Sequence, residues 1–400
     1  MKITYLSSVC AQTRFDNLVS KGVINAQFQN QKFHHLLLKG LAHFSDNQIT
    51  VISYYPIIRK GNRVRKHNTD NEDNIKYIYP GHINIPIINH ISKFIGAYKY
   101  LVKTKASLGI IVCNIMNFEE CYAAIVYRFF HHTKICAVTA DVPGLTSGSG
   151  SKNGAWWKRV LTKWITPIYI KSRSRYDAYM FLAAAMNDVV NKNSKPYIVV
   201  EGIADLSMLD TNNELSNKFP QKTIMYAGGL HREYGIELLI KAFEKIEQLN
   251  VELRLYGRGN FVPEIETIAK KDPRVRYLGT VSNGEIIKAQ IKAHVLVNPR
   301  PTDAEFVKYS FPSKIMECMA SGTPLLTTRI PSMPQEYYPY VYFIEEETVE
   351  GISKALVELL SLTGEQLHHK GDEAKTFILE NKNYLAQGKK LNELLLSLNN

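Results

Sequence analysis

Residues 298–324 read NPRPTDAEFVKYSFPSKIMECMASGTP. An apolar strand ends near Asn298, and a polar loop follows it. Ser313 is suited to cap a helix over residues 314–319, because its hydroxyl can accept a hydrogen bond from the first helical turn. Gly322 ends this helix before the next strand. The first turn of this helix presents unpaired N–H groups and a partial positive charge, so the segment predicts an anion-binding site.

Cationic side chains gather around the start of this predicted helix. Ser313 and Lys314 lie at the helix start, with Lys308 and Arg300 just upstream. A diphosphate bound there would meet charge-assisted hydrogen-bond donors. Glu317 lies one turn further along, where a carboxylate can accept two hydrogen bonds from ribose hydroxyls. An equally good interpretation is that Glu317 only complements the helix dipole.

The rest of the chain alternates short apolar runs with longer amphipathic ones. Its 400 residues are too many for one compact core, and the alternation predicts two α/β domains with parallel sheets. The predicted strands are residues 1–6, 48–54, 108–113, 134–139, 178–182, 196–200, 223–226, 253–256, 276–278, 295–298, 324–327 and 341–344. The clearest predicted helices are residues 34–44, 119–131, 236–249 and 384–398. Composition predicts loops at residues 60–75 and 146–154 and a linker at residues 205–221.

The net charge of +12 is unevenly distributed along the chain. Residues 1–205 hold 26 Lys and Arg against 12 Asp and Glu, a net charge of +14, whereas the remaining residues carry −2. An excess of one sign on one domain predicts an anionic surface or an anionic substrate there.

Within the basic half, residues 150–176 contain seven basic residues and no acidic one. Basic residues interleaved with aromatic ones suit a helix that lies on an anionic membrane. The predicted contacts are Trp156, Trp157, Lys158, Arg159, Lys163 and Trp164. The alternative is an ordinary helix with its Trp inside and its Lys outside. Nucleic acid is not expected as a partner, because no recognised binding motif accompanies the charge.

Cysteine and histidine usage predicts reduced thiols and no metal site. The five cysteines are scattered and form no C-x-x-C pair. The pairs His34–His35 and His131–His132 lack further ligands at metal-binding spacing, so neither a metal nor a cofactor is predicted. No run reaches the roughly 18 to 20 apolar residues of a membrane span, and the N-terminus has no signal-peptide pattern. These features favour a cytoplasmic protein.

Residues 311–324 read F-P-S-K-x-x-E-x-M-A-S-G-T-P and resemble the donor-binding segment of retaining GT-B glycosyltransferases, of the family 4 kind. Shorter stretches that resemble the same family lie at residues 199–205, 226–243, 253–259 and 276–281. In that family the helix faces a cleft between two Rossmann-like domains, and its N-terminus meets the diphosphate of the donor. The resemblance implies an acceptor domain over residues 1–205, a donor domain over residues 206–380, and a helix over residues 381–400 that returns toward the first domain.

The resemblance also implies individual contacts with the donor. The Glu at the start of the helix, Glu317 here, holds the ribose, and the end of the stretch at residues 276–281 touches the base, which implicates Val281. A Glu that often contacts the donor sugar eight residues earlier is replaced by Tyr309. Glu305 is the candidate substitute, although it equally suits a solvated loop.

The family's diphosphate-binding loop is altered in this chain. Its usual Arg and Lys are replaced by Gly229 and Tyr234. We expect Arg232 in the same loop, with Lys308 or Lys314 opposite, to supply the missing charge, although Arg232 equally suits a solvated helix start. These departures leave the identity of the donor open.

The implied reaction is transfer of a sugar from a nucleoside-diphosphate sugar, with UDP favoured by its frequency in the family. The family retains the anomeric configuration and needs no metal. We expect Lys314, Ser313, Arg232 and the helix end to stabilise the departing diphosphate. Asp141 follows the strand at residues 134–139, where active groups of such sheets gather, although it also suits a simple turn.

The expected acceptor is a lipid-linked saccharide or oligosaccharide in bacterial surface polysaccharide assembly, at the inner face of the cell membrane. Two other functions remain open. One is a nucleotide-sugar epimerase of the same fold, which would turn over donor without acceptor. The other is a catalytically silent subunit that binds a nucleotide sugar and releases no nucleotide.

Overall fold

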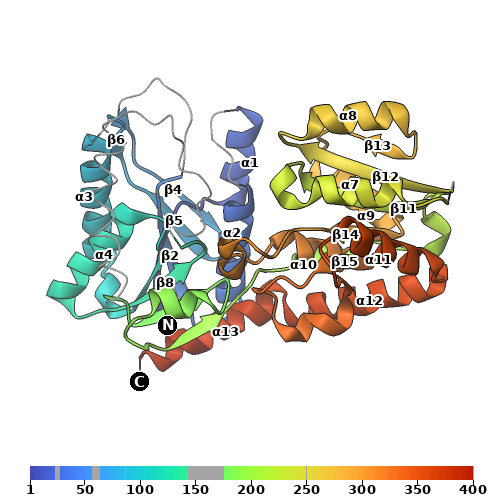
Figure 1. Cartoon of the computed structure of the whole chain (residues 1–400). Helices are drawn as coiled ribbons and strands as arrows, with labels where there is room; N and C mark the ends of the chain where they lie inside the picture. The colour runs from blue at the N-terminus through green and yellow to red at the C-terminus, as the bar shows by residue number, and fades with distance from the viewer. Residues whose placement is uncertain (23–27, 56–63, 86, 143–174, 249, 400) are drawn as a thin grey trace. The chain divides into compact units, whose positions relative to one another are not determined.

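The computed structural model describes residues 1–22, 28–55, 64–85, 87–142, 175–248 and 250–399. The predicted loop at residues 146–154 and the predicted membrane contacts from Trp156 to Trp164 lie outside these ranges. Contacts divide the chain into two units, Met1–Ile203 with Tyr384–Asn400, and Ala204–Asn383. Each unit is a mostly parallel sheet with helices packed against it (Figure 1).

The first unit is built on an eight-stranded sheet in the order β10-β9-β8-β7-β1-β2-β5-β4, in which only β4 runs antiparallel to its neighbour. Its strands are β1 Lys2–Ser7, β2 Gln48–Ser53, β4 Asn68–Glu72, β5 Ile75–Tyr79, β7 Ile110–Asn114, β8 Lys134–Thr139, β9 Ala178–Phe181 and β10 Tyr197–Val199. Central strands such as β7, which reads IIVCN, are buried along their whole length, as continuous apolar runs predict for a parallel sheet. A separate ribbon pairs β3 (Val64–Arg65) with β6 (His82–Ile83).

Helices cover both faces of this sheet (Figure 1). Helices α3 (Ile88–Lys103) and α4 (Phe118–His131) pack together on one face, whereas α1 (Gln12–Ser20) and α2 (Phe28–Ala42) lie on the other. The last helix of the chain, α13 (Tyr384–Ser397), packs against α2 and adds its leucines to the core of the first unit. The predicted return of the C-terminal helix to the first domain is therefore confirmed. The remaining described helices of the unit are α6 Met186–Val190 and the 3-10 helix Ala106–Leu108.

Two glycines allow α13 to approach α2 closely. A Cβ atom on Gly40 would lie 2.1 Å from the carbonyl oxygen of Tyr384, and one on Gly388 would lie 2.6 Å from the Cα atom of Gly40. Because the opposing atoms belong to the backbone, Gly40→Ala should force the helices apart and lower the free energy of unfolding by about 1–3 kcal/mol. Chemical denaturation measures this change. Gly284→Ala is the control, because no atom lies within 4 Å of the added methyl group, and equal stability of the two variants would contradict the packing.

The second unit has a six-stranded parallel sheet in the order β13-β12-β11-β14-β15-β16. Its strands are β11 Lys222–Gly229, β12 Val251–Arg258, β13 Val275–Tyr277, β14 Val295–Asn298, β15 Leu325–Thr328 and β16 Tyr342–Ile344. Its helices are α7 Ile236–Glu244, α8 Val262–Lys271, α9 Asn283–Lys292, α10 Ser313–Ala320, α11 Val349–Ser361 and α12 Gly364–Asn381. Two apolar clusters pack on the sheet, one with α7 and α11 and the other with α9, α10 and α12. The predicted α/β class with parallel sheets is confirmed.

The prediction of a loop at residues 60–75 is wrong over its described part. Residues 64–75 contain β3 and β4, and β5 begins at their end. Strand β4 reads NTDNE and pairs with β5 at the edge of the sheet. An edge strand can expose its side chains to water, so its sequence needs no alternation of apolar and polar residues. That alternation is the signal by which a strand is predicted, and β4 lacks it.

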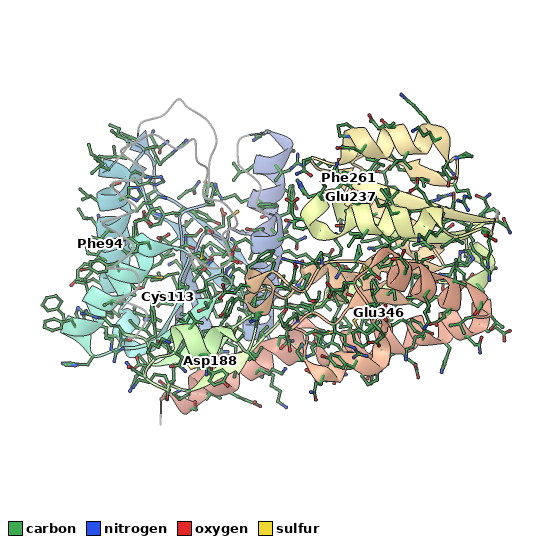
Figure 2. The ribbon with its side chains drawn as sticks, in the orientation of Figure 1. Phe94, Cys113, Asp188, Glu237, Phe261 and Glu346 are labelled. Atoms are coloured by element: carbon green, nitrogen blue, oxygen red, sulfur yellow. The ribbon has the colours of Figure 1, made fainter. Side chains whose placement is uncertain are left out.

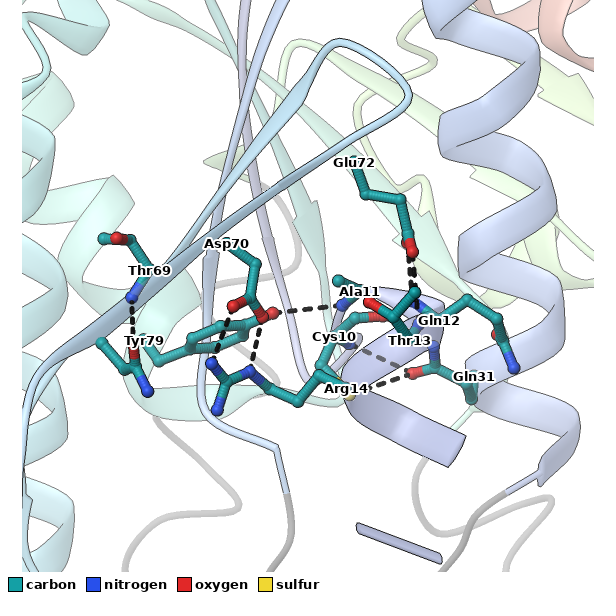
Figure 3. Close-up of polar contacts among 11 residues, drawn as sticks. Cys10, Ala11, Gln12, Thr13, Arg14, Gln31, Thr69, Asp70, Glu72 and Tyr79 are labelled. Carbon is teal, nitrogen blue, oxygen red and sulfur yellow. Dashed lines mark hydrogen bonds and ion pairs between the residues drawn. The ribbon is translucent and has the colours of Figure 1, made fainter. Parts of the chain in front are cut away.

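The missed strand β4 supplies two carboxylates that hold the first turn of α1 (Figure 3). The guanidinium of Arg14 donates to Asp70 over 2.5 and 2.7 Å, which lowers the pKa of Asp70. Glu72 accepts hydrogen bonds from the N–H groups of Gln12 and Thr13, at 2.6 and 3.2 Å. A carboxylate is favoured there, because these N–H groups open α1. The edge strand thus positions the start of α1, which follows the first strand-to-helix loop.

The predicted linker at residues 205–221 lies within the second unit. It contains the 3-10 helices Leu206–Asp210 and Leu215–Asn217. The ammonium of Lys218 donates to the carbonyl oxygens of Ile291 and Ala293, at 2.9 and 2.8 Å. The polar composition is typical of a linker, but these side-chain contacts tie the segment to the body of the unit. In the same unit α7 ends at Glu244, short of the predicted helix end.

The five cysteines are all buried free thiols, as predicted. No helix in the described ranges is long and apolar enough to cross a membrane.

Candidate functional site

Ligands of open parallel sheets bind beyond the carboxyl ends of the strands, where the strand order reverses. In the second unit this point lies between β11 and β14, which are neighbours in the sheet although β12 and β13 separate them in the chain. Strand β11 ends at Gly229 and β14 at Asn298. The residues that follow these ends, together with the start of α10, form a candidate anion site.

Lys314, in the first turn of α10, points toward the glycine turn that ends β11. Its ammonium lies 4.3 Å from the centre of the Tyr226 ring, and a Cβ atom on Gly228 would lie 1.6 Å from its Nζ. The hydroxyl of Tyr226 donates to the carbonyl oxygen of Gly229 at 2.9 Å, which fixes the ring. Glycine at position 228 therefore makes room for the lysine, and the ring face favours its positive charge.

Arg300, just after β14, brings a second cation to the site. Its guanidinium carbon lies 5.1 Å from the ring centre of Phe306 and 5.8 Å from that of Tyr234. Its Nε is buried and has no hydrogen-bond partner among the residues that the structure describes. The hydroxyl of Thr328 donates to the carbonyl oxygen of Arg300 at 2.6 Å and anchors its backbone. Within the described ranges, the guanidinium thus lies against aromatic rings and pairs with no carboxylate.

Neither cation forms an ion pair with a carboxylate among the described residues. Burial lowers the pKa of Lys314; Cys318 and Glu317 oppose this shift, and the charge of Arg300 adds to it. Burial also lowers the pKa of Arg300. Partly buried cations that repel each other are unfavourable unless a negative charge joins them. The arrangement therefore suits an anionic ligand.

Helix α10 begins one residue earlier than the sequence predicts. Its N-cap is Pro312, and no side chain caps the helix, so the expectation that Ser313 caps it is wrong. Proline already holds the φ of −72° that allows the chain to enter the helix at this point. Ser313 is the exposed first helical residue, next to Lys314. The open N-terminus adds its partial positive charge to the anion site.

The other predicted donor contacts lie in the same unit. Glu317 is partly buried one turn beyond Lys314, close enough to act on its pKa. Val281 is partly buried in the loop between β13 and α9, and Glu305 and Lys308 are exposed in a 3-10 helix before α10. The structure brings together Gly229, Arg300, Ser313, Lys314 and Glu317. Donor contacts by Val281, Glu305 and Lys308 stay predictions.

Arg232 does not join the anion site, contrary to the sequence expectation. Its guanidinium donates to Glu237 at 2.5 Å and to Glu264 at 2.8 Å, and it lies 4.6 Å from the ring centre of Phe261. These partners belong to α7, α8 and the residue before α8. Two carboxylates already compensate the charge of Arg232, so Arg300 is the better source of positive charge for a diphosphate.

Three adjacent strands present bare backbone beside the anion site. Gly228 of β11 pairs with Gly257 of β12, and the N–H of Gly257 donates at 2.8 Å to the carbonyl oxygen of Gly279, which follows β13. A Cβ atom on Gly257 would lie 1.8 Å from the carbonyl oxygen of Gly228. Without side chains here, a ligand can approach the sheet edge closely.

The first unit has its own reversal point, between β1 and β7. A pocket of about 850 Å³ is lined there by Ser8 after β1, Asn114 at the end of β7 and Asp141 after β8. Asn30, Asn117 and Lys93 also line it, so most of its polar groups are neutral. Asp141 thus lies where the strand-end rule places it, and its contact with a substrate stays a prediction. Neutral amides and hydroxyls suit a sugar.

A buried hydrogen-bond chain supports this pocket. The Nδ2 group of Asn114 donates to Nε2 of His34 at 2.8 Å, and Nδ1 of His34 lies 2.6 Å from the hydroxyl of Tyr5. Burial lowers the pKa of His34 to about 3, so the imidazole is neutral. His34 therefore positions Asn114. Within the described ranges, no three His, Cys, Asp or Glu residues are grouped so that they could hold a metal ion.

Sequence reasoning missed the aromatic walls of the anion site and most of the pocket in the first unit. Tyr226 belongs to a strand and Tyr234 is a departure from the family pattern, so neither was expected to hold a cation. Asn114 and Lys93 lie far apart in the sequence, and only the fold brings them together. The one available signal was the position of Asn114 at the end of a predicted strand.

Comparisons with known proteins agree with this architecture. Residues 221–362 match the family of glycosyl transferases group 1, and no curated protein matches the chain. The catalytic domain of starch synthase IV from Arabidopsis thaliana, bound to ADP and acarbose, is 11% identical, with a TM-score of 0.67 over 99% of each chain. HepE from Anabaena, in complex with UDP, is 11% identical, with a TM-score of 0.62 over 99% of this chain and 100% of HepE.

A lipopolysaccharide outer core galactosyltransferase is 12% identical, with a TM-score of 0.63 over 99% of each chain. Likeness at such low identity shows the fold, and the chain has the GT-B fold that the resemblance implies. The family match and these neighbours support a glycosyltransferase of GT-B type.

Proposed function

We propose that this protein transfers a sugar from a nucleoside-diphosphate sugar to an acceptor hydroxyl. The observation that carries the proposal is the pair Lys314 and Arg300, two partly buried cations with no carboxylate partner among the described residues. They lie at the reversal point of the second sheet, where a diphosphate would supply the missing negative charge. The match of residues 221–362 to glycosyl transferases supports the same ligand.

In the proposed reaction the bond between the anomeric carbon and a diphosphate oxygen breaks, and its electron pair leaves with the phosphate. The transition state resembles an oxocarbenium ion, with negative charge growing on the leaving group. Lys314, Arg300 and the N–H groups of α10 would stabilise that charge without a metal. The acceptor oxygen bonds to the carbon from the leaving-group side, with retention, and its proton passes to the departing phosphate.

The donor contacts are part of the same proposal. Glu317 would accept hydrogen bonds from the ribose, and the glycine edge formed by Gly228, Gly257 and Gly279 leaves room for the base near Val281. UDP is the favoured nucleotide, and the HepE structure contains UDP. The pocket that contains Asn114 would hold the acceptor, which we propose is a lipid-linked saccharide at the inner face of the cell membrane. The likeness to a lipopolysaccharide galactosyltransferase supports this acceptor.

Replacing Glu317 with alanine should weaken UDP binding by about 10- to 100-fold, because hydrogen bonds to a charged group contribute about 1.5–3 kcal/mol. Isothermal titration with UDP measures the change. Glu266→Ala, which removes an exposed carboxylate of α8, is the control and should bind UDP like the wild type. Unchanged affinity in Glu317→Ala would mean that Glu317 only complements the helix dipole.

The proposed function is tested in two steps. The first screens nucleotide sugars for an increase in the thermal unfolding temperature. The second measures nucleotide release from the stabilising donor, with and without membrane extract as the source of acceptor. We expect release that depends on the extract. Conversion of the donor without extract would instead indicate an epimerase, binding without release would indicate a silent subunit, and no stabilisation by any nucleotide sugar would reject the site.

A further inference from the structure

One helix of the first unit presents an apolar face to solvent. Helix α3 exposes Ile88, Ile91 and Ile95 by 44%, 55% and 57% of their surface. At about 3.6 residues per turn these three side chains lie on one side of the helix. Ala97 and Leu101, on the opposite side, are buried. The isoleucines therefore occupy the side that a globular protein normally fills with polar residues.

The ribbon of β3 and β6 lies beside α3, next to its start (Figure 1). Val64 pairs with Ile83, and their side chains are exposed by 63% and 36%. The N–H of Ile83 donates to the hydroxyl of Ser92 in α3 at 3.1 Å, so the ribbon is fastened to the helix. The surface, called the α3 face below, consists of Val64, Ile83, Ile87, Ile88, Ile91 and Ile95.

Most other apolar side chains of α3 face the inside of the unit, although Val102 is also exposed. Phe94, labelled in Figure 2, packs against Tyr122 of α4, with ring centres 5.9 Å apart. The inward side of α3 thus accounts for its packing on α4. The α3 face is additional apolar surface, which neither the core nor the proposed acceptor pocket uses.

The segment that contains α3 is basic in sequence, and the acidic residue that follows it, Glu119 of α4, pairs with His90 of α3. No acidic residue occurs between Asp73 and Glu119 in the sequence, whereas five lysines do: Lys76, Lys93, Lys99, Lys103 and Lys105. Lys99 and Lys103 are exposed on α3, beside the isoleucines on the helix surface. Exposed isoleucines suit the acyl boundary of a bilayer, and flanking lysines suit anionic headgroups. A protein partner would need a matching acidic and apolar surface, whereas an anionic bilayer offers both properties without further specificity.

We propose that the α3 face docks the first unit onto an anionic membrane surface. The inference rests on the proposed function, because the proposed lipid-linked acceptor is the reason for the protein to bind a membrane. Lys93, on the same helix, lines the acceptor pocket. By helical periodicity Lys93 lies on the side of α3 opposite the isoleucines, so docking by the α3 face would leave the pocket side of the helix free.

The test is sedimentation of the full chain with phosphatidylcholine vesicles, with and without phosphatidylglycerol, and without nucleotide. We expect binding only to the anionic vesicles, with loss of binding at high salt. Ile91→Ser with Ile95→Ser should weaken binding by about tenfold or more. Lys99→Glu with Lys103→Glu should weaken it by a similar factor.

Matched controls carry the same chemical changes on the second unit. Leu209→Ser with Val357→Ser removes exposed apolar side chains, and Lys271→Glu with Lys354→Glu removes exposed lysines; both pairs should bind vesicles like the wild type. Equal binding by all variants would overturn the proposal. The proposal would also be overturned if light scattering showed a dimer of the wild type and a monomer of the variant with Ile91→Ser and Ile95→Ser. The α3 face would then be an interface between two copies of the chain.

The docking proposal and the transferase proposal fail in different measurements. Vesicle binding is measured without a donor, and UDP binding is measured without vesicles. If the protein binds UDP normally but does not bind vesicles, the docking proposal is rejected and the transferase proposal stands. If it binds vesicles normally but binds no nucleotide, the transferase proposal is rejected and the docking proposal stands.

Discussion

Replacing Lys314 with methionine should slow nucleotide release by about 10²- to 10³-fold, the usual effect of removing one group that stabilises a developing negative charge. The ammonium lies against Tyr226 and has no carboxylate partner among the described residues. It is therefore available to a leaving diphosphate, whose charge grows as the glycosidic bond breaks. Steady-state release of nucleotide from the donor measures kcat. Lys292→Met, at the exposed end of α9, should leave kcat unchanged.

The same variant distinguishes a binding role of Lys314 from a structural one. Burial and the charge of Arg300 both disfavour the ammonium, so the neutral methionine should keep or raise the thermal unfolding temperature while activity falls. A structural lysine would lose stability and activity together. Because the pKa of Lys314 is lowered, the ammonium loses its proton at a lower pH than an ordinary lysine does. The UDP affinity of the wild type should therefore begin to fall at that lower pH. Lys314→Met should lack this pH dependence.

Strands and helices with strong apolar patterns were predictable from the sequence. The predicted strands at residues 134–139 and 295–298 have the bounds of β8 and β14, because central strands of a parallel sheet must be apolar throughout. Strand β4 could not be predicted in this way. Its pairing with β5 uses the backbone, and its side chains are free to be polar and to hold Arg14 and the start of α1.

The candidate site was predictable only where one short segment contains it. Lys314 and Glu317 lie in the first turns of one helix, whose N-terminus favours an anion, although Glu317 alone also suits a helix-dipole role. Arg232 and Arg300 both follow strands, and the sequence does not show which charge is available. Packing decides this: Glu264, distant in the sequence, pairs with Arg232, whereas Arg300 meets aromatic rings.

Gly228→Ala should reproduce most of the effect of removing Lys314, although Gly228 has no side chain. The added Cβ atom would lie 1.6 Å from the Nζ of Lys314 and 3.2 Å from the hydroxyl of Tyr226. Because the ammonium ends a flexible chain, it can move away while strand β11 stays in place. The φ of +155° at Gly228 adds strain of about 1–3 kcal/mol for any other residue. We therefore expect a folded protein with kcat/KM lowered by about 10²-fold or more.

A double-mutant comparison shows whether the methyl group acts through the lysine. If its main effect is to displace the ammonium, Gly228→Ala should add little to Lys314→Met, and the combined loss of kcat/KM should be far smaller than the product of the single losses. Gly364→Ala, whose methyl group would meet only Leu215 at an ordinary 3.5 Å, is the control and should behave like the wild type. If the loss of kcat/KM in the double variant equals the product of the two single losses, the two residues act independently. The donor would then need the bare backbone at Gly228 for a reason other than the position of Lys314.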